Sequence, residues 1–213
     1  MFKRLNTGGE NLSNQEIRNC TVRLLDGGAR FMRFIVELSA MEDFRTCTDT
    51  LTDDAKQMRF DQELVLRFFA FKNNKDAYTH DVGDFMTDSL EAIAVSAGGT
   101  SFEYEQERQA FARTFRILAN TLDEKAFGWV NNRGSLVRGF AVYHYEAFTL
   151  GIQSALDRIN PNDQGHMTRL RQLFEGIKAD PKFIAITTGG GRNSKEALDL
   201  RVQFVEHRIP EAL

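Results

Sequence analysis

The sequence contains few of the residues that mark secreted, membrane or metal-binding proteins. Its two cysteines, Cys20 and Cys47, exclude a disulfide scaffold and favour a reducing, cytoplasmic location. No run of about 18 apolar residues occurs, so no membrane-spanning segment is expected. The N-terminus also lacks the apolar segment of a signal peptide. The four histidines and two cysteines have no zinc-ligand spacing, so we expect no structural metal.

Proline is also scarce, and this scarcity bears on the fold class. Only three prolines occur in 213 residues, all of them after residue 160, and the remaining chain is rich in helix-forming residues. The length suits one large domain or two small ones. We therefore predict a mainly α-helical bundle of about seven or eight helices.

The charge balance excludes a simple basic nucleic-acid binder. The net charge is −3, and residues 48–125 carry 15 acidic against 9 basic residues. Arginine outnumbers lysine 19 to 8, which suits bidentate partners such as carboxylate or phosphate. The simpler interpretation is that these arginines pair with acidic residues on helix faces.

Periodicity and capping signals predict where most helices lie. SNQE at residues 13–16 is a capping box that begins a helix ending near the DGG of residues 26–28. Apolar stripes and cap residues predict further helices within residues 28–41, 61–71, 81–97, 102–121, 135–159, 162–179 and 194–208. FIAIT, residues 183–187, resembles a short strand.

The segment DQELVLRFFAF, residues 61–71, is apolar except for a few polar side chains. Glu63 and Arg67 are i,i+4 neighbours on a helix. A buried arginine needs a paired charge, so we predict a structural ion pair between these two residues.

The chain opens on a segment that suits an anion. Residues 4–9 read RLNTGG, whose glycines let the backbone approach a ligand closely, and the helix after Ser13 directs its amino end toward this turn. The alternative is an ordinary turn, with Arg4 paired to a nearby glutamate. The candidate nucleotide- or phosphate-binding residues are Arg4, Asn6, Thr7, Gly8 and Gly9.

FKRLNTGGENLSNQEIRN, residues 2–19, resembles a signature of the GmrSD-type restriction endonuclease N-terminal-domain family, long catalogued as a domain of unknown function. The match covers Phe2, the RLNTGG of residues 4–9, Leu12 and the QEIRN of residues 15–19. ELVLRFFAF, residues 63–71, is similar to a second segment of that family. Both matches lie in the first third of the chain.

The resemblance implies a ParB/sulfiredoxin-like α/β domain followed by helices. Family members carry a DGQQR motif tied to nucleotide hydrolysis or nuclease-related activity, and they act in modification-dependent restriction and phage defence. Arg4 and Asn6 would then contact phosphate, while Gly8 and Gly9 would permit the turn. The complete protein would use a nucleoside triphosphate and Mg²⁺, whereas we expect no cofactor for this chain alone.

The chain departs from the family in lacking the DGQQR motif and any HNH-type nuclease constellation. We therefore expect residues 1–25 to be the end of a ParB-like domain and residues 26–213 to be a helical domain. An upstream DGQQR-bearing fragment or partner subunit, a second copy of the chain, and DNA are the expected partners. The expected function is a non-catalytic component of a restriction or phage-defence protein; the alternative is a helical interaction module without a nucleotide site.

Three further segments carry polar residues in suggestive patterns. TTGGGRNSKEA, residues 187–197, does not fit the spacing of a P-loop, but Arg192, Asn193 and Lys195 are candidate DNA contacts. The alternative is a flexible connection into a helix capped by Ser194. WVNNRGS, residues 129–135, either stacks on nucleic acid or anchors a loop through its tryptophan. Residues 143–146, YHYE, point in different directions on a helix and form no catalytic set by spacing.

Overall fold

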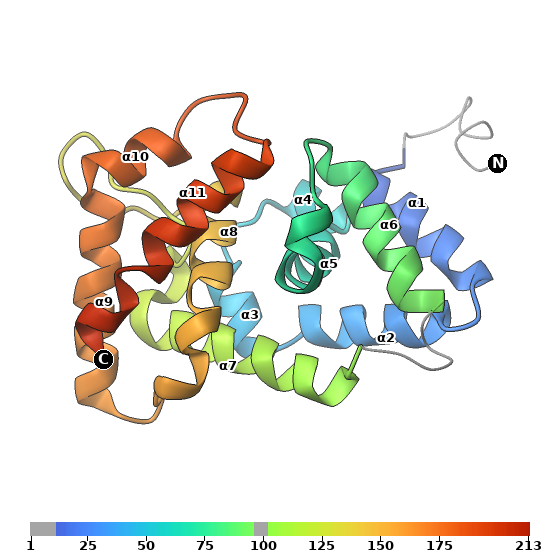
Figure 1. Cartoon of the computed structure of the whole chain (residues 1–213), viewed down its shortest axis with the longest axis horizontal. Coiled ribbons are helices and arrows are strands. Elements are labelled where there is room, and N and C mark those ends of the chain that lie inside the picture. Colours follow the sequence, from blue (N-terminus) through green and yellow to red (C-terminus); the bar gives the residue numbers. More distant parts are fainter. Residues whose placement is uncertain (1–11, 96–101) are drawn as a thin grey trace. The chain divides into compact units, whose positions relative to one another are not determined.

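The computed structural model describes residues 12–95 and 102–213, and within them the chain is mainly α-helical, as predicted (Figure 1). Two compact units are present. Unit 1 comprises Met1–Ala40 and Thr52–Glu107, and unit 2 comprises Met41–Leu51 and Arg108–Leu213. The helical part that the sequence assigns to residues 26–213 is thus divided between two units, and the assignment of residues 1–25 to a ParB-like domain stays a prediction.

The helices of unit 1 surround a central apolar helix, α5 (Phe60–Asn74). Its side chains from Leu64 to Phe71 are buried on all faces apart from Arg67, as expected for a helix in the middle of a core. Figure 1 shows α5 among its neighbours, and the helices that pack against it are α1 (Asn14–Thr21), α2 (Gly28–Ser39), α4 (Asp53–Gln57) and α6 (Val82–Val95).

Aromatic rings fill the core of unit 1. The ring centroid of Phe34 lies 5.5 Å from that of Phe69 and 5.7 Å from that of Phe102. Phe71 and Phe85 stack at 5.1 Å. Such pairs add to the stability that burial of their area provides. The phenylalanine stripe that the sequence predicts on α2 therefore does face a core.

Unit 2 is built around α8 (Val142–Gly151), whose residues from His144 onward are all buried. The unit also contains α3 (Glu42–Cys47), α9 (Gln164–Ala179), α10 (Pro181–Thr187) and α11 (Lys195–Glu206). A long helix, α7 (Tyr104–Leu122), contributes its first turn to unit 1 and its remaining residues to unit 2. Phe148 of α8 contacts the rings of Phe174 and Phe183, 5.3 and 5.7 Å away.

Two local predictions are wrong. FIAIT is not a strand but most of α10, because Asp180 caps the helix by accepting from Lys182 N and Pro181 occupies its first turn. No helix begins at Ser135. Residues 129–141 instead form an extended loop with a bridge between Val130 and Leu136, and the helix starts at Val142.

A turn centred on Asn131 explains the second error. The Asn131 side-chain oxygen accepts from the backbone N–H groups of Arg133 and Ser135, and Gly134 adopts a φ of 75°. An asparagine that bonds the following backbone favours a turn over a helix. The same loop carries Trp129, whose ring packs over Gly139 and stays 44% exposed. The tryptophan therefore packs onto its own loop.

The close approach of α8 and α11 depends on the absence of a side chain at Gly151. A Cβ atom there would lie 2.7 Å from Val205 Cβ and 3.0 Å from Val202 O. We expect Gly151→Ala to lower the free energy of unfolding by about 1–3 kcal/mol through overpacking. Gly176→Ala, in α9, is the matched control, because a Cβ atom placed there meets no heavy atom within 4 Å beyond the backbone of its own helix. This variant should raise the free energy of unfolding by about 0.5–1 kcal/mol. Urea unfolding curves that shift equally for both variants would contradict this packing.

Candidate functional site

The candidate phosphate-binding residues Arg4, Asn6, Thr7, Gly8 and Gly9 lie outside the described residues, and their role stays a prediction. The helix that follows them is described. Ser13 caps α1 by accepting from Glu16 N at 3.2 Å, and Glu16 accepts from Ser13 N at 2.8 Å, which completes the predicted capping box. The Ser13 hydroxyl also donates to Met58 O at 2.7 Å, which ties the start of α1 to the residues before α5.

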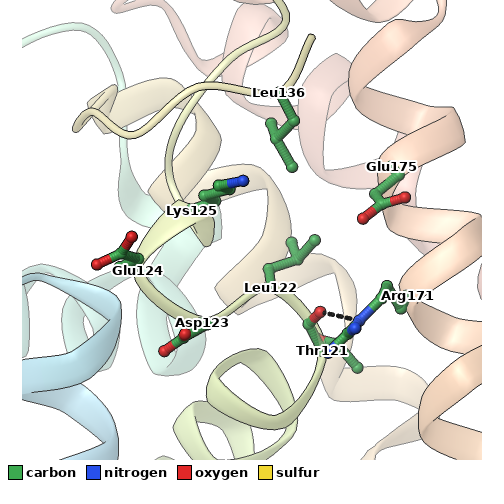
Figure 2. A pocket seen from close by; sticks show the side chains of 8 residues that line it. All are labelled: Thr121, Leu122, Asp123, Glu124, Lys125, Leu136, Arg171 and Glu175. Carbon is green, nitrogen blue, oxygen red and sulfur yellow. Dashed lines mark hydrogen bonds between the residues drawn. The ribbon is translucent and has the colours of Figure 1, made fainter.

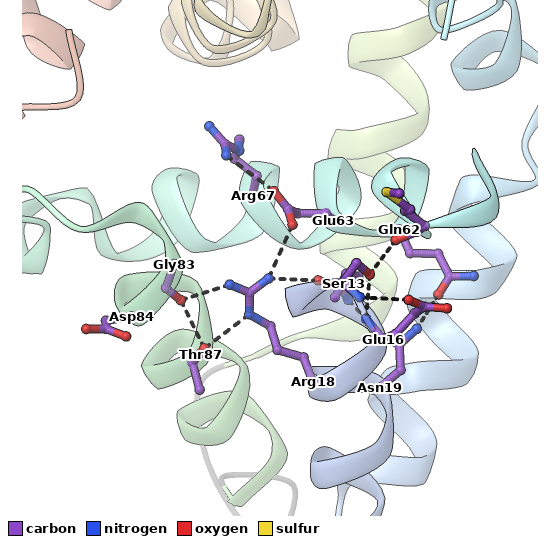
Figure 3. A network of polar contacts seen from close by, with 12 residues as sticks. Ser13, Glu16, Arg18, Asn19, Gln62, Glu63, Arg67, Gly83, Asp84 and Thr87 are labelled. Carbon is purple, nitrogen blue, oxygen red and sulfur yellow. Dashed lines mark hydrogen bonds and ion pairs between the residues drawn. The ribbon is translucent and has the colours of Figure 1, made fainter. Parts of the chain in front are cut away.

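Arg18 of α1 is the centre of a polar network inside unit 1 (Figure 3). Its side chain is nearly inaccessible to solvent, with a relative exposure of 4% for the residue. The guanidinium donates to Gly83 O at 2.9 Å and to Thr87 Oγ1 at 3.1 Å, both on α6. It also donates to Gln15 Oε1 at 3.2 Å. Burial lowers the pKa of Arg18, and the nearby carboxylate of Glu63 opposes that shift.

Glu63 of α5 contacts two arginines. Its Oε1 lies 3.4 Å from Arg67 Nη2, so the predicted pair is present in the structure, and its Oε2 lies 3.4 Å from Arg18 Nη1. Sequence spacing identified only the Arg67 neighbour, since Arg18 is 45 residues away. A single carboxylate thus neutralises part of the charge of two largely buried cations.

A chain of side-chain amides runs beside this charge cluster. Gln15 Nε2 donates to Asn19 Oδ1 at 2.9 Å, and Asn19 Nδ2 donates to Gln62 Oε1 at 2.7 Å. Gln15 and Gln62 are both buried, so these bonds satisfy groups that would otherwise lose contact with water. The polar residues of the QEIRN segment therefore all hold or cap α1, and they fix it against α5 and α6.

Two polar residues of the glycine-rich loop before α11 bond to other groups of the protein. Arg192 donates to Ala185 O at 2.7 Å, and Asn193 accepts from Tyr143 OH at 3.2 Å. Gly189 and Gly191 have φ values of 93° and 75°, which explains two of the three glycines. Ser194 caps α11 as predicted, by accepting from Ala197 N. DNA contact by Arg192, Asn193 and Lys195 stays a prediction.

A buried ion pair lies between α8 and α11 and reaches this loop. Glu146 Oε2 accepts from Arg201 Nη2 at 2.6 Å and from Arg201 Nε at 2.8 Å. The third guanidinium nitrogen donates to Arg192 O at 2.9 Å. Arg201 also lies over the Tyr143 ring, 4.6 Å from its centroid. The pair therefore connects two helices to the backbone of the loop.

A second buried cation, Lys178 of α9, has three acceptors for its three protons. It donates to Ala126 O at 2.9 Å and to Gly128 O at 2.8 Å, and His144 Nδ1 is 3.2 Å away. An acceptor role for Nδ1 places the His144 proton on Nε2. Burial lowers the pKa of Lys178 well below its ordinary value. Burial, with the positive charge of Lys178, lowers the pKa of His144 to about 3, against one backbone bond that raises it.

These buried residues show what spacing could not reveal about the YHYE segment. His144 and Glu146 each face a cation from another helix, Lys178 and Arg201, which lie 34 and 55 residues away. All donors of Lys178 already have acceptors, and His144 is neutral at physiological pH. The arrangement fixes the loop after α7 to α8 and α9, and it presents no nucleophile or proton donor to a substrate.

A polar cleft of about 290 Å³ lies elsewhere in unit 2 (Figure 2). Figure 2 shows Lys125 and Glu175 on opposite sides of it, with Arg171 directed to Thr121. Arg171 Nε donates to Thr121 O at 2.7 Å. The volume is at the lower end of ligand-binding pockets. In the described parts of the chain, no group of three or more His, Cys, Asp or Glu residues is placed to hold a metal ion.

None of the described helices combines the length and the hydropathy that crossing a bilayer requires.

Removing the Arg18 guanidinium should loosen α1. We expect Arg18→Met to lower the free energy of unfolding by about 2–4 kcal/mol, because Gly83 O and Glu63 lose a buried charged donor. The exposed neighbour Arg23 provides the control, and Arg23→Met should change stability by less than about 0.5 kcal/mol. Urea unfolding followed by circular dichroism measures both. Equal midpoints for the two variants would show that the network contributes no stability.

The lowered pKa of His144 predicts a stability loss in mild acid. Between pH 6.5 and about 3 the unfolded chain binds a proton at this position and the folded chain does not, so stability falls as pH falls. From pH 7 to pH 5 the expected loss from this group is about 2 kcal/mol. The His144→Asn variant keeps an acceptor for Lys178 but has no imidazole to protonate. Between pH 7 and pH 5 its free energy of unfolding should therefore fall by about 2 kcal/mol less than that of the wild-type protein.

Urea unfolding at pH 7, 6 and 5 tests this expectation. The exposed His207→Asn variant controls for the loss of an imidazole elsewhere in unit 2. Parallel stability curves for the wild-type protein and His144→Asn would contradict the proposed neutral, buried state of His144.

Comparisons of the chain with protein families, curated proteins and solved structures gave no match.

Proposed function

We propose that this chain is a helical, non-catalytic component of a GmrSD-type restriction or phage-defence protein. In this role it holds the nucleotide-facing turn of residues 4–9 and contacts DNA or a partner. A DGQQR-bearing segment or subunit supplies the remainder of the nucleotide site, together with the nucleoside triphosphate and Mg²⁺. The proposal follows from the resemblance of residues 2–19 and 63–71 to that family.

One observation carries this proposal: the two segments that resemble the family bond to each other. Arg18 belongs to the first segment and Glu63 to the second, and their side chains meet at 3.4 Å in a largely buried site. Asn19 and Gln62 pair beside them at 2.7 Å. The contacts support treating both segments as parts of one functional unit.

The position of α1 in the sequence connects the polar network around Arg18 with the proposed nucleotide site. It begins at Asn14, after residues 10–13 that follow the RLNTGG segment, and the N-terminus of a helix favours an anion nearby. Arg18 and Asn19 anchor this helix to α6 and α5 through their bonds to Gly83 O and Gln62. In the proposal they act as positioning residues for a phosphate contact made by Arg4 and Asn6.

The alternative is a helical interaction or oligomerisation module without a nucleotide site. Exposed apolar side chains in unit 1 favour it. Leu24 is 77% exposed and Val95 is 66% exposed. They belong to segments that meet where Gly27 N donates to Ala94 O at 3.1 Å. Exposed apolar groups that lie close together are typical of association surfaces.

Binding of nucleoside triphosphate and DNA, by the chain alone and mixed with a DGQQR-bearing family fragment, tests the proposal. We expect binding that needs both pieces and that falls at least about tenfold in Arg4→Ala, since one charged phosphate contact is removed. Arg23→Ala is the control because it removes the same charge from an exposed position. The oligomeric state of the chain, measured by analytical ultracentrifugation, is recorded in parallel.

Absence of nucleotide and DNA binding in every mixture, for a folded chain that self-associates, would contradict the proposal. It would favour the interaction module. In that case Leu24→Asp should shift the chain toward the monomer.

A further inference from the structure

The polar cleft of unit 2 lies between α9 and the segment that joins the end of α7 to the following loop (Figure 2). Its volume is about 290 Å³. α9 contributes Arg171 and Glu175 to its walls, residues 121–125 form the other side, and Leu136 completes it. Charged side chains of both signs therefore line one small space.

Two cations of α9 hold the walls of this cleft together at a fixed spacing. Arg171 Nε donates to Thr121 O at 2.7 Å. Lys178, about two turns further along α9, donates to Ala126 O at 2.9 Å and to Gly128 O at 2.8 Å. The segment opposite α9 is thus tied to the helix on both sides of the cleft. Closing the cleft by a movement of the backbone would break at least one of these bonds.

Glu175 lies on α9 between these two cations. It follows Arg171 by four residues and precedes Lys178 by three, so the helical repeat places all three side chains on one face. Arg171 and Lys178 bond to the opposite segment. Within the part of the chain that the structure describes, the carboxylate of Glu175 has no hydrogen bond or ion pair. It is therefore available to a cation that enters the cleft.

Lys125 faces Glu175 from the other side of the cleft. Figure 2 shows the two side chains directed toward the space between them. Lys125 also has no hydrogen bond or ion pair among the residues described. The bonds of Arg171 and Lys178 keep the walls apart at this point, so the two opposite charges do not pair with each other. The cleft consequently presents an ammonium on one wall and a carboxylate on the other.

The two further acidic residues of the cleft do not compete for Lys125 in this arrangement. Glu124 Oε2 lies 2.9 Å from Arg138 Nη2, which neutralises its charge. Figure 2 shows the carboxylates of Asp123 and Glu124 on the far side of Lys125, directed away from Glu175. The charge pattern inside the cleft is therefore one cation facing one anion.

We propose that this cleft binds a small free amino acid in its zwitterionic form. The ligand carboxylate pairs with Lys125, the ligand ammonium pairs with Glu175, and its side chain contacts Leu136. A volume of about 290 Å³ is at the lower end of ligand pockets, which suits a small metabolite. Both ion pairs lie near the surface, where such pairs contribute little, so binding in the millimolar range is expected. The inference goes beyond the proposed function and does not depend on it, because the cleft shares no residue with residues 4–9.

Nuclear magnetic resonance on the full chain tests the inference with three ligands of one carbon skeleton. L-alanine carries both charges, ethylamine only the ammonium and propionate only the carboxylate. The methyl signals of Leu136 and the backbone amide signals of Lys125 and Glu175 are followed at constant ionic strength. We expect saturable shifts with L-alanine, and binding of ethylamine and of propionate that is at least about threefold weaker, because each lacks one ion pair.

Two variants that each remove one charge make the assignment specific. Lys125→Met should weaken L-alanine binding at least about threefold and should not weaken ethylamine binding. Glu175→Gln should weaken L-alanine binding to a similar extent and should not weaken propionate binding. A purely structural role would weaken all three ligands in either variant. Lys182→Met and Glu211→Gln, at exposed positions of unit 2 outside the cleft, are the controls and should bind L-alanine as the wild-type protein does.

Three results would overturn the inference: no saturable shift with L-alanine, equal binding of the three ligands, or wild-type affinity for L-alanine in both cleft variants. L-alanine carries no phosphate. Its failure to bind is therefore distinguishable from failure of the nucleotide and DNA proposal.

Discussion

Buried cations that bond to backbone carbonyl groups hold the helices of each unit in place. In unit 1, Arg18 donates to Gly83 O, and in unit 2, Lys178 donates to Ala126 O and Gly128 O. Arg201 does the same for Arg192 O. A charged donor inside a protein is costly unless every proton has an acceptor, so each of these side chains tolerates little rearrangement around it. The positions of α1, of the residues that follow α7 and of the glycine-rich loop before α11 follow from this requirement.

Arginines of this chain pair with acidic residues, as at Arg138, Arg201 and Arg208, and they also serve a second purpose. Several arginines contact carbonyl groups at or near helix ends and in connections: Arg113 bonds Leu156 O and Ile159 O, Arg169 bonds Ala212 O, and Arg171 bonds Thr121 O. The last turn of any helix has carbonyl groups without partners inside the helix. A guanidinium satisfies two or three of them at once because its donors are fixed in a fork.

The sequence predicts features that depend on neighbours along the chain. The capping box at Ser13, the cap at Ser194 and the Glu63–Arg67 pair all follow from spacings of three or four residues. Predictions at positions where two local preferences compete were less successful. The apolar, β-branched residues of FIAIT favoured a strand, but the Asp180–Pro181 helix start prevailed. The main buried charges could not be predicted, because Arg18 meets Gly83, Lys178 meets His144 and Arg201 meets Glu146 across 34 to 65 residues.

This distribution of roles limits where function can lie in the chain. Lys178, Arg201 and Arg18 are buried, and each donates to groups of the protein itself. The three protons of Lys178 all have acceptors, so none is left to offer a substrate. Sites for ligands are therefore better sought away from these buried charges. A buried titratable group can mark a joint of the fold as readily as it marks catalysis.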